Sequence, residues 1–216
     1  MHKAPVGVIA IGMVGTSLKR YFEEYRGYVR GLDLFLYDRD PAKEYHDDVN
    51  RADVIFIAVP TPSMADGSAG LAAVEDAFAR IAPGKVAVLK STVPPGTTEY
   101  FQKKYPALKI LFNPEFLTER RAWEDFTKPD RQIVGFTSAS VDAAHLVLSL
   151  LPKAPFMSPW GIGTYRPVKI TATEAEIIKY GGNVYFARKV NFANVLADLA
   201  ILHGAEYENV RLGMAA

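Results

Sequence analysis

Four polar residues, Thr92, Glu115, Lys179 and Asn183, have types and spacings that could act on an oxygen that gains charge during a reaction. Lys179 and Asn183 lie four residues apart in a predicted helix, so their side chains share one face, one turn apart. An ammonium and a carboxamide placed there can both donate hydrogen bonds to a developing alkoxide. By spacing alone, the simpler explanation is an exposed lysine beside a helix-surface asparagine.

Glu115 and Thr92 each follow a predicted strand. Glu115 comes after Asn113-Pro114, and because proline disfavours helix at the preceding residue, Glu115 is predicted to begin a loop over the sheet edge. Its carboxylate could orient water or accept a proton there, or it could only stabilise the start of a following helix. The Thr92 hydroxyl precedes a rigid Val93-Pro94-Pro95 turn and could bind water or a cofactor, or could satisfy its own backbone.

The stretch Val6–Leu18, VGVIAIGMVGTSL, has the pattern of a dinucleotide-binding loop with one departure. The slots of the Gly-x-Gly-x-x-Gly fingerprint hold Ala10, Gly12 and Gly15. Gly12 would let the backbone approach a pyrophosphate, and Gly15 would let the helix pack on the strand. The free N–H groups of that helix would face the phosphates. Alanine costs little at a negative φ and about 1–2 kcal/mol at a positive φ.

A second cofactor signal is Asp38, which ends the second predicted strand in LFLYDRDP. A carboxylate there accepts hydrogen bonds from ribose hydroxyls and repels a 2′-phosphate, which favours NAD over NADP. Arg39 beside it weakens that preference. The sequence therefore predicts NAD as the cofactor, and the alternative is a Rossmann-like domain that has lost its ligand.

The elements that must position these residues alternate between short apolar strands and helices. The strands are predicted at residues 6–11, 34–37, 54–59, 86–90, 110–112 and 132–135. The helices between them are predicted at residues 14–25, 70–81, 97–104, 119–124 and 141–150. Near-continuous apolar strands that alternate with helices predict an α/β fold, a Rossmann-like, doubly wound, mostly parallel sheet followed by a long C-terminal helix.

The long helix is predicted from about residue 173 to 203. Thr173 is interpreted as its N-cap with Glu176 completing a capping box, and Gly204 as its C-terminal stop. The expected division is an NAD-binding domain over residues 1–165 and a helical region over 166–216. Apolar residues on this helix would be exposed in a monomer, so the helix is expected to pack on a partner chain, as a homodimer through residues 173–203, or on a second domain. These are Phe186, Val190, Val195 and Leu199.

Composition excludes several classes of function. The 216 residues carry a net charge of +1 and no cysteine, which excludes disulfides and thiolate chemistry within this sequence. The four histidines lie far apart, so no metal site is expected. The near-neutral charge and the lack of an 18-residue apolar run give no reason to expect a nucleic acid or a membrane as partner, and the expected location is the cytoplasm.

Five stretches in a fixed order resemble the UDP-glucose/GDP-mannose 6-dehydrogenase family. They are ADVIFIAVPTPSMADGS (52–68), KSTVPPGTT (90–98), NPEFLTER (113–120), PDRQIVG (129–135) and TEAEIIKYGGNVYFARKVNFAN (173–194). The resemblance covers nearly the whole sequence. It matches that family's N-terminal NAD domain and the central helix through which its members dimerise.

The resemblance implies roles for individual residues at the cofactor. The pyrophosphate loop corresponds to Gly12, Met13, Val14 and Gly15, and the ribose positions to Asp38 and Lys43. Loops lining the cofactor correspond to Val59, Thr61, Pro62, Ser91 and Thr92, and the carboxylate facing the cofactor to Glu119. Among the catalytic positions, Thr92 corresponds to a threonine that holds water, Glu115 to the catalytic glutamate, and Lys179 and Asn183 to the residues that contact the reacting oxygen.

The resemblance implies oxidation of the C6 alcohol of a UDP- or GDP-sugar to a carboxylate with two NAD molecules. The family's catalytic cysteine lies in a C-terminal domain that this sequence does not contain, so we expect a truncated or partner-dependent chain that does not complete turnover. The departures from the family pattern are Ala10, Arg120, Arg121 and Val195.

Two alternatives remain open at this point. One is a stand-alone dehydrogenase like the β-hydroxyacid dehydrogenases, which also combine a Rossmann domain with a Lys-x-x-x-Asn helix and need no cysteine, although NPEFLTER is foreign to them. The other is a non-catalytic module that binds NAD or dimerises, with Ala10 as a sign of relaxed function.

Overall fold

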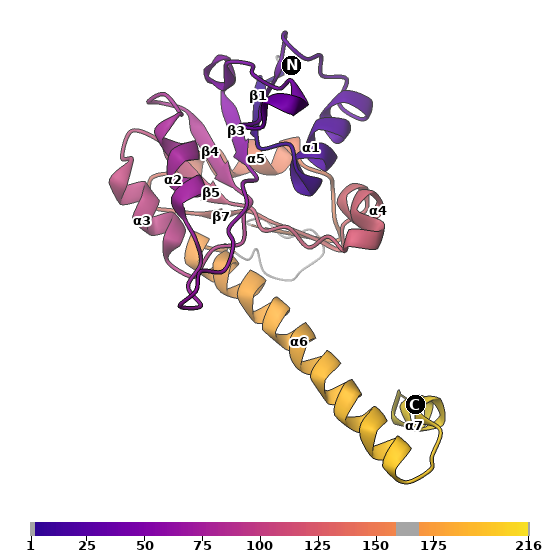
Figure 1. The fold of residues 1–216 in the computed structure, drawn as a ribbon. Coiled ribbons are helices and arrows are strands. Elements are labelled where there is room, and N and C mark those ends of the chain that lie inside the picture. The colour runs from indigo at the N-terminus through magenta and orange to yellow at the C-terminus, as the bar shows by residue number, and fades with distance from the viewer. Residues whose placement is uncertain (1–2, 159–168, 216) are drawn as a thin grey trace. The chain divides into compact units, whose positions relative to one another are not determined.

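The structure, a computed structural model, describes residues 3–158 and 169–215 (Figure 1). The chain divides into two compact units, Met1–Lys179 and Tyr180–Ala216, and the residues that could do chemistry fall almost entirely in the first. The domain boundary expected at residues 165 and 166 lies outside the described residues.

The first unit is built on a sheet with the strand order β2-β1-β3-β4-β5-β7. Its strands are β1 (Val6–Ile9), β2 (Leu34–Tyr37), β3 (Val54–Ile57), β4 (Val86–Leu89), β5 (Lys109–Phe112) and β7 (Gly135–Phe136). The first five strands pair in parallel and β7 pairs antiparallel with β5. A small parallel pair joins β6 (Arg131–Ile133) to β8 (Phe156–Ser158). The predicted mostly parallel sheet is confirmed.

Helices cover both faces of this sheet. They are α1 (Met13–Glu24), α2 (Ala72–Ala79), α3 (Thr97–Lys104), α4 (Ala122–Thr127) and α5 (Ala144–Leu150). The start of α6 (Ala172–Leu202) also packs in the core of the first unit, and the helix continues into the second unit, where α7 (Tyr207–Ala215) follows. Short 3-10 turns occur at Pro41–Lys43, Val49–Arg51, Glu119–Arg121 and Val141–Ala143. The helices thus follow the strand–helix alternation that the sequence predicts.

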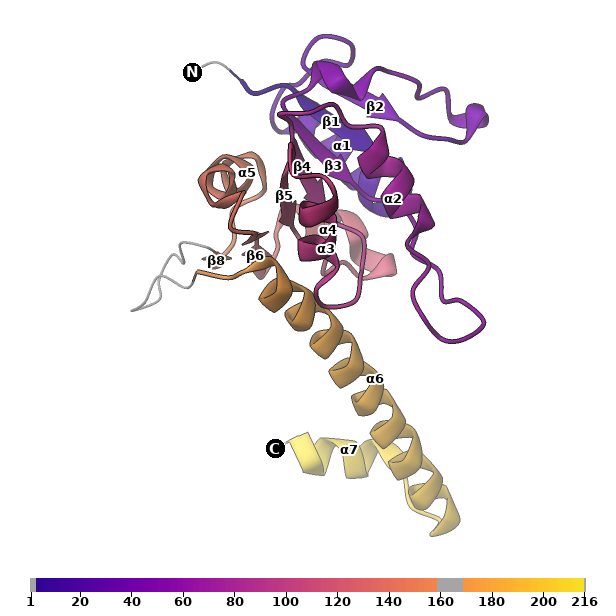
Figure 2. The same ribbon diagram turned by 90° about the vertical axis from the view of Figure 1, so that its left-hand side faces the viewer.

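Successive strand residues face two separate cores, because side chains alternate across a strand. Val8 and Phe56 are fully buried beneath α1, α4 and α5, and Ile55 and Ile57 are fully buried beneath α2, α3 and the first turn of α6. Figure 2 shows α5 and α3 on opposite sides of the strands. This double burial explains the near-continuous apolar strand sequences.

The structure corrects several predicted bounds. The strands expected at 6–11, 54–59 and 86–90 end one or two residues earlier, where the chain leaves the sheet to form loops. The single strand expected at 132–135 is two strands, because β6 pairs with β8 whereas Gly135 and Phe136 pair with β5. The sequence analysis did not predict β8 or α7.

The predicted capping box of the long helix is wrong by two residues. The N–H and hydroxyl of Thr171 donate to Glu174 at 2.7 and 2.8 Å, so this pair caps α6. Glu176 is completely buried and instead accepts hydrogen bonds from the Gly96 and Thr98 N–H groups, at 2.6 and 2.7 Å, at the start of α3. Both pairs match Thr-x-x-Glu, and only the tertiary contact of Glu176 with α3 distinguishes them.

The second unit carries exposed apolar side chains on α6, as expected. Phe186 is 58% exposed and Val195 is 66% exposed. The helix runs unbroken past Gly181 and Gly182, and Gly204 ends it with a φ of 65°, which confirms the predicted stop. Among the described residues, no helix is both long and apolar enough to cross a membrane.

Candidate functional site: a dinucleotide cavity and a lysine–glutamate cluster

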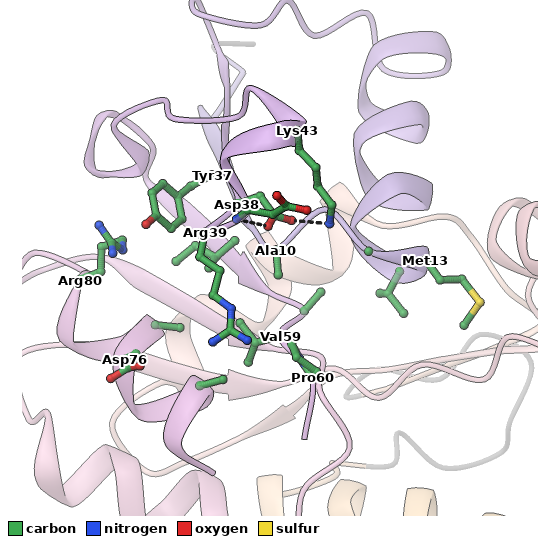
Figure 3. Close-up of a pocket in the computed structure, with 17 residues that line it drawn as sticks. Ala10, Met13, Tyr37, Asp38, Arg39, Lys43, Val59, Pro60, Asp76 and Arg80 are labelled. Carbon is green, nitrogen blue, oxygen red and sulfur yellow. Dashed lines mark hydrogen bonds and ion pairs between the residues drawn. The ribbon is translucent and has the colours of Figure 1, made fainter. Parts of the chain in front are cut away.

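A cavity of about 640 Å³ opens at the point where the strand order reverses. Because β1 lies between β2 and β3, the chain leaves β1 on one side of the sheet and β3 on the other, and ligands of open α/β sheets bind in the crevice so formed. The cavity is lined by Ile9 at the end of β1, by Ala10 after it, and by Ala58, Val59 and Pro60 after β3 (Figure 3). Sheet topology therefore places the cavity where a dinucleotide is expected.

The loop after β1 places different demands on its three fingerprint positions, Ala10, Gly12 and Gly15. Ala10 has a φ of 71°, so the alanine occupies a left-handed conformation that costs about 1–2 kcal/mol. A Cβ on Gly15 would lie 2.0 Å from the Ala10 carbonyl oxygen, which excludes any side chain there. A Cβ on Gly12 would meet nothing within 4 Å among the described residues, so this position is open toward the cavity that Gly12 lines.

Gly12 is also the N-cap of α1, and no side chain of the described residues caps this end of the helix. The first turn carries no acidic residue, so the N–H groups of Met13, Val14 and Gly15 present positive charge without a built-in anion. The fit to a diphosphate is thus made by backbone geometry.

Asp38 is 5% exposed and is held by three donors. Its Oδ2 accepts from Ile11 N–H at 2.7 Å and from Lys43 Nζ at 2.9 Å, and its Oδ1 accepts from Asp40 N–H at 3.0 Å. Burial alone would raise the pKa of Asp38, but these hydrogen bonds together hold it below its usual value. A carboxylate fixed in this way can still accept a hydrogen bond from a ribose hydroxyl.

The far wall of the cavity comes from α2 and was not predicted. The Arg80 guanidinium lies 4.0 Å from the centre of the Tyr37 ring, and Ala73, Asp76 and Ala77 complete this wall. Figure 3 shows the Arg39 side chain directed toward Val59 and Asp76. The topological reversal between β1 and β3 was the signal that could have identified α2.

Of the predicted cofactor residues, six line the cavity: Gly12, Met13, Val14, Asp38, Lys43 and Val59. Gly15 lies behind it and supports the loop. Thr61 and Ser91 connect the loops after β3 and β4, because the Thr61 hydroxyl donates to Thr92 O and the Ser91 hydroxyl donates to Val59 O, each at 2.7 Å. Pro62 is exposed on the same loop. The side chain of Glu119 lies outside the described residues.

A second cluster joins Glu115 to two lysines. Glu115 follows β5 in a loop, as predicted, and its Oε2 lies 3.0 Å from Nζ of Lys90, a residue that the sequence analysis did not single out. Lys179 on α6 donates from Nζ to the backbone oxygen of Glu115. Burial lowers the pKa of Lys179; Glu115 opposes this shift, whereas Arg131 and Lys90 add to it. The cluster therefore contains Lys90, which is paired with a carboxylate, and Lys179, whose pKa is lowered.

The two remaining predicted catalytic residues differ in what the structure shows. The Thr92 hydroxyl makes no hydrogen bond to any described residue, so it does not satisfy its own backbone. Asn183 is exposed and lies in the second unit, whereas the residues of the cluster belong to the first. Within the described parts of the chain, no group of His, Cys, Asp and Glu could hold a metal ion.

Comparison with known proteins gives the family of this chain. Residues 40–148 match the model of the UDP-glucose/GDP-mannose dehydrogenase family, NAD binding domain. This chain belongs to that family. The match begins just after Asp38, so the Ala10–Gly15 loop is supported by geometry more than by the family model.

The curated relatives are dehydrogenases of nucleotide sugars. The UDP-glucose 6-dehydrogenase of Pseudomonas aeruginosa is 37% identical over 179 residues, which cover 76% of this chain and 38% of that protein. The Haloferax volcanii enzyme of the same name is 34% identical over 248 residues, covering 95% of this chain and 56% of the relative. The chain thus spans about two fifths to a little over half of the length of these relatives.

Among solved structures, a UDP-glucose dehydrogenase from Pyrobaculum islandicum superimposes with a TM-score of 0.77 at 27% identity, covering 99% of this chain and 56% of that one. The predicted Rossmann-like fold and the predicted cofactor, NAD, are therefore confirmed. The long helix belongs to the shared architecture.

Proposed function

We propose that this chain is the NAD-binding part of a nucleotide-sugar 6-dehydrogenase that oxidises the C6 alcohol of a UDP- or GDP-sugar. The observation that carries the proposal is the cavity at the β1/β3 reversal, where the open Gly12 position, the uncapped start of α1 and the fixed Asp38 carboxylate converge. Each feature matches one chemical group of the cofactor, namely the diphosphate for the first two and the ribose for the third.

The residues of this chain would contribute as follows. The N–H groups of Met13, Val14 and Gly15 bind the diphosphate, and Asp38 with Lys43 orients the adjoining ribose. NAD⁺ bound there would supply the acceptor for a hydride from an alcohol carbon.

At the other end of the site, Lys179 donates a hydrogen bond to the sugar oxygen as it gains charge, while Glu115 and the Thr92 hydroxyl hold water beside it. The same donor role is proposed for Asn183 from the family resemblance alone. Glu119 is the proposed carboxylate facing the cofactor.

A homodimer through residues 173–203 is part of the proposal. It is supported by the exposed apolar side chains of α6, which include Val184, Tyr185 and Phe192. Because the sequence has no cysteine, we do not expect this chain by itself to form the thiol adduct that the second oxidation requires.

The test combines NAD⁺ titration by calorimetry with an assay for NADH formation from UDP-glucose and from GDP-mannose. We expect saturable NAD⁺ binding without complete oxidation of either sugar. Turnover of a small hydroxyacid would instead favour a β-hydroxyacid dehydrogenase. A stable dimer without NAD⁺ binding would favour a non-catalytic module and contradict the proposal.

A further inference from the structure

Lys90 is the most deeply buried lysine side chain of the cluster, although lysine is rarely buried without a partner. It directly follows β4 and its side chain is 2% exposed. Its Nζ donates to Asn113 Oδ1 at 2.7 Å and lies 3.0 Å from Glu115 Oε2. The buried charge is therefore matched by one carboxylate and one amide oxygen.

The side chain of Asn113 is itself held in place by β6. Its Nδ2 donates to the Gln132 side chain at 3.0 Å and to the backbone oxygen of Ile133 at 2.7 Å, both in β6. These two bonds orient the amide so that Oδ1 faces Lys90. Lys90 is thus connected through Asn113 to β6.

Glu115 lies between two cations that contact different atoms. Its carboxylate pairs with Lys90, and its backbone oxygen accepts from Lys179. Its other carboxylate oxygen accepts from Phe116 N–H at 2.9 Å. Glu115 therefore attracts a positive charge on Lys179, and Lys90, paired with the same carboxylate, offsets part of that attraction.

The charged groups that face Lys179 come from three other segments. They are Glu115 in the loop after β5, Arg131 in β6 and Lys90 at the end of β4. The Arg131 guanidinium lies 4.0 Å from the centre of the Phe116 ring and the Lys179 ammonium 5.5 Å from it, so both cations contact the same ring. Two positive groups and one compensated carboxylate surround the Lys179 amine.

We propose that Lys90 is a positioning residue of this site, whose buried side chain fixes the Glu115 carboxylate and repels a second positive charge at Lys179. The inference rests on the proposed function, in which Glu115 and Lys179 lie at the reacting sugar. Lys90 thereby sets the pH above which Lys179 no longer offers an ammonium to the sugar oxygen.

The experiment follows the side-chain NMR signal of Lys179 in the full chain through a pH titration, without NAD⁺ or sugar. Lys179→Arg assigns the signal. In Lys90→Met, we expect the pKa of Lys179 to rise by about one unit, because a repelling charge is lost and Glu115 is no longer compensated. In Lys90→Arg, which keeps the charge, the pKa should stay close to the wild-type value.

Two further variants keep the inference falsifiable. Glu115→Gln should move the pKa of Lys179 in the opposite direction, downward, because its one attracting carboxylate is lost while Lys90 remains. Lys104→Met is the matched control, since Lys104 pairs with Glu75 at an exposed site and should leave Lys179 unchanged.

An unchanged titration of Lys179 in folded Lys90→Met, or no downward shift in Glu115→Gln, would overturn the inference. If Lys90→Met does not fold, Lys90→Gln, whose neutral amide can still bond to Asn113, takes its place with the same expected rise. Because the titration uses no ligand, its outcome is independent of NAD⁺ binding, so failure of this inference and failure of the proposed function are distinguishable.

Discussion

The dinucleotide cavity and the Lys90–Glu115–Lys179 cluster satisfy their polar groups in different ways. In the cavity, backbone N–H groups of the α1 N-terminus are left open, and the one buried carboxylate, Asp38, is held largely by nearby backbone. In the cluster, side chains from separate segments neutralise one another. Binding in the cavity therefore depends on the main-chain geometry of the loop. In the cluster, the removal of one charged side chain changes the electrostatic environment of the others.

The largest effect is expected from Gly15→Ala, which tests how strictly the backbone-built site depends on geometry. Its methyl group would overlap the Ala10 carbonyl, so the free energy of unfolding should fall by about 3 kcal/mol or more. Urea denaturation measures this change.

Gly12→Ala is the matched control, because its methyl group would enter open space at a negative φ. We expect normal stability but weaker NAD⁺ binding. Equal stability losses in the two variants would show that the loop does not have the described geometry.

Asp38→Ala separates the two regions. Losing a charged acceptor should weaken NAD⁺ binding by roughly 2 kcal/mol, or about thirtyfold in Kd, while the titration of Lys179 stays unchanged. Asp142→Ala, which removes a surface carboxylate paired with Lys109, is the control. Calorimetry measures the binding, and an unaltered Kd in Asp38→Ala would remove Asp38 from the cofactor site.

Asp38 should also affect stability at acidic pH. Because its pKa is lowered in the folded state, the carboxylate stabilises the fold above the ordinary value of 3.8. This contribution is lost as the pH falls through the lower folded pKa. Asp38→Asn should therefore lose less stability than the wild type on acidification, as followed by urea denaturation at several pH values.

Glu176→Ala perturbs the contact between the start of α6 and α3 and spares the cavity. It leaves the N–H groups of Gly96 and Thr98 without their acceptor, so we expect a loss of about 2 kcal/mol in stability and no change in the Kd for NAD⁺. A loss of NAD⁺ binding in this variant would mean that the two regions are coupled.

The pH dependence of Glu176 has the opposite sign to that of Asp38. Burial raises the pKa of Glu176 above 4.5 despite its hydrogen bonds from Thr98 and Gly96. Its contribution is present below 4.5 and is lost as the pH rises through the raised value. Glu176→Gln should lack this decline, and a wild-type profile in the variant would contradict the assignment.

The smallest effect is expected for Ala10→Gly. Because Ala10 has a positive φ, glycine should relieve strain and stabilise the fold by about 0.5–1 kcal/mol, partly offset by its greater freedom when unfolded. Unfolding in urea checks the sign, and destabilisation would argue against the left-handed conformation of Ala10.

The sequence predicted the cavity well because its features are local. The Ala10–Gly15 spacing and the position of Asp38 after β2 are set by a strand, a turn and a helix that are contiguous in the chain. The sheet itself followed from apolar runs that alternate with helices.

The rest depends on contacts between distant residues. Lys90 and Asn113 lie 23 positions apart, and nothing local distinguishes a buried Lys90 from an exposed lysine after a strand. The choice between the Thr171–Glu174 and Thr173–Glu176 pairs likewise depended on the contact with α3. The position of α2 at the cavity wall depended on the strand order.

The most direct test of the account is an NMR titration of backbone amides with NAD⁺ in the full chain. The account predicts saturable shifts at Gly12, Met13, Val14 and Gly15, at Ile11 and Asp40, whose N–H groups contact Asp38, and at α2 residues that line the cavity. In Asp38→Ala, the same shifts should require about thirtyfold more NAD⁺ for saturation. Saturable shifts confined to other parts of the chain, or none at all, would contradict the claim that this cavity holds the cofactor.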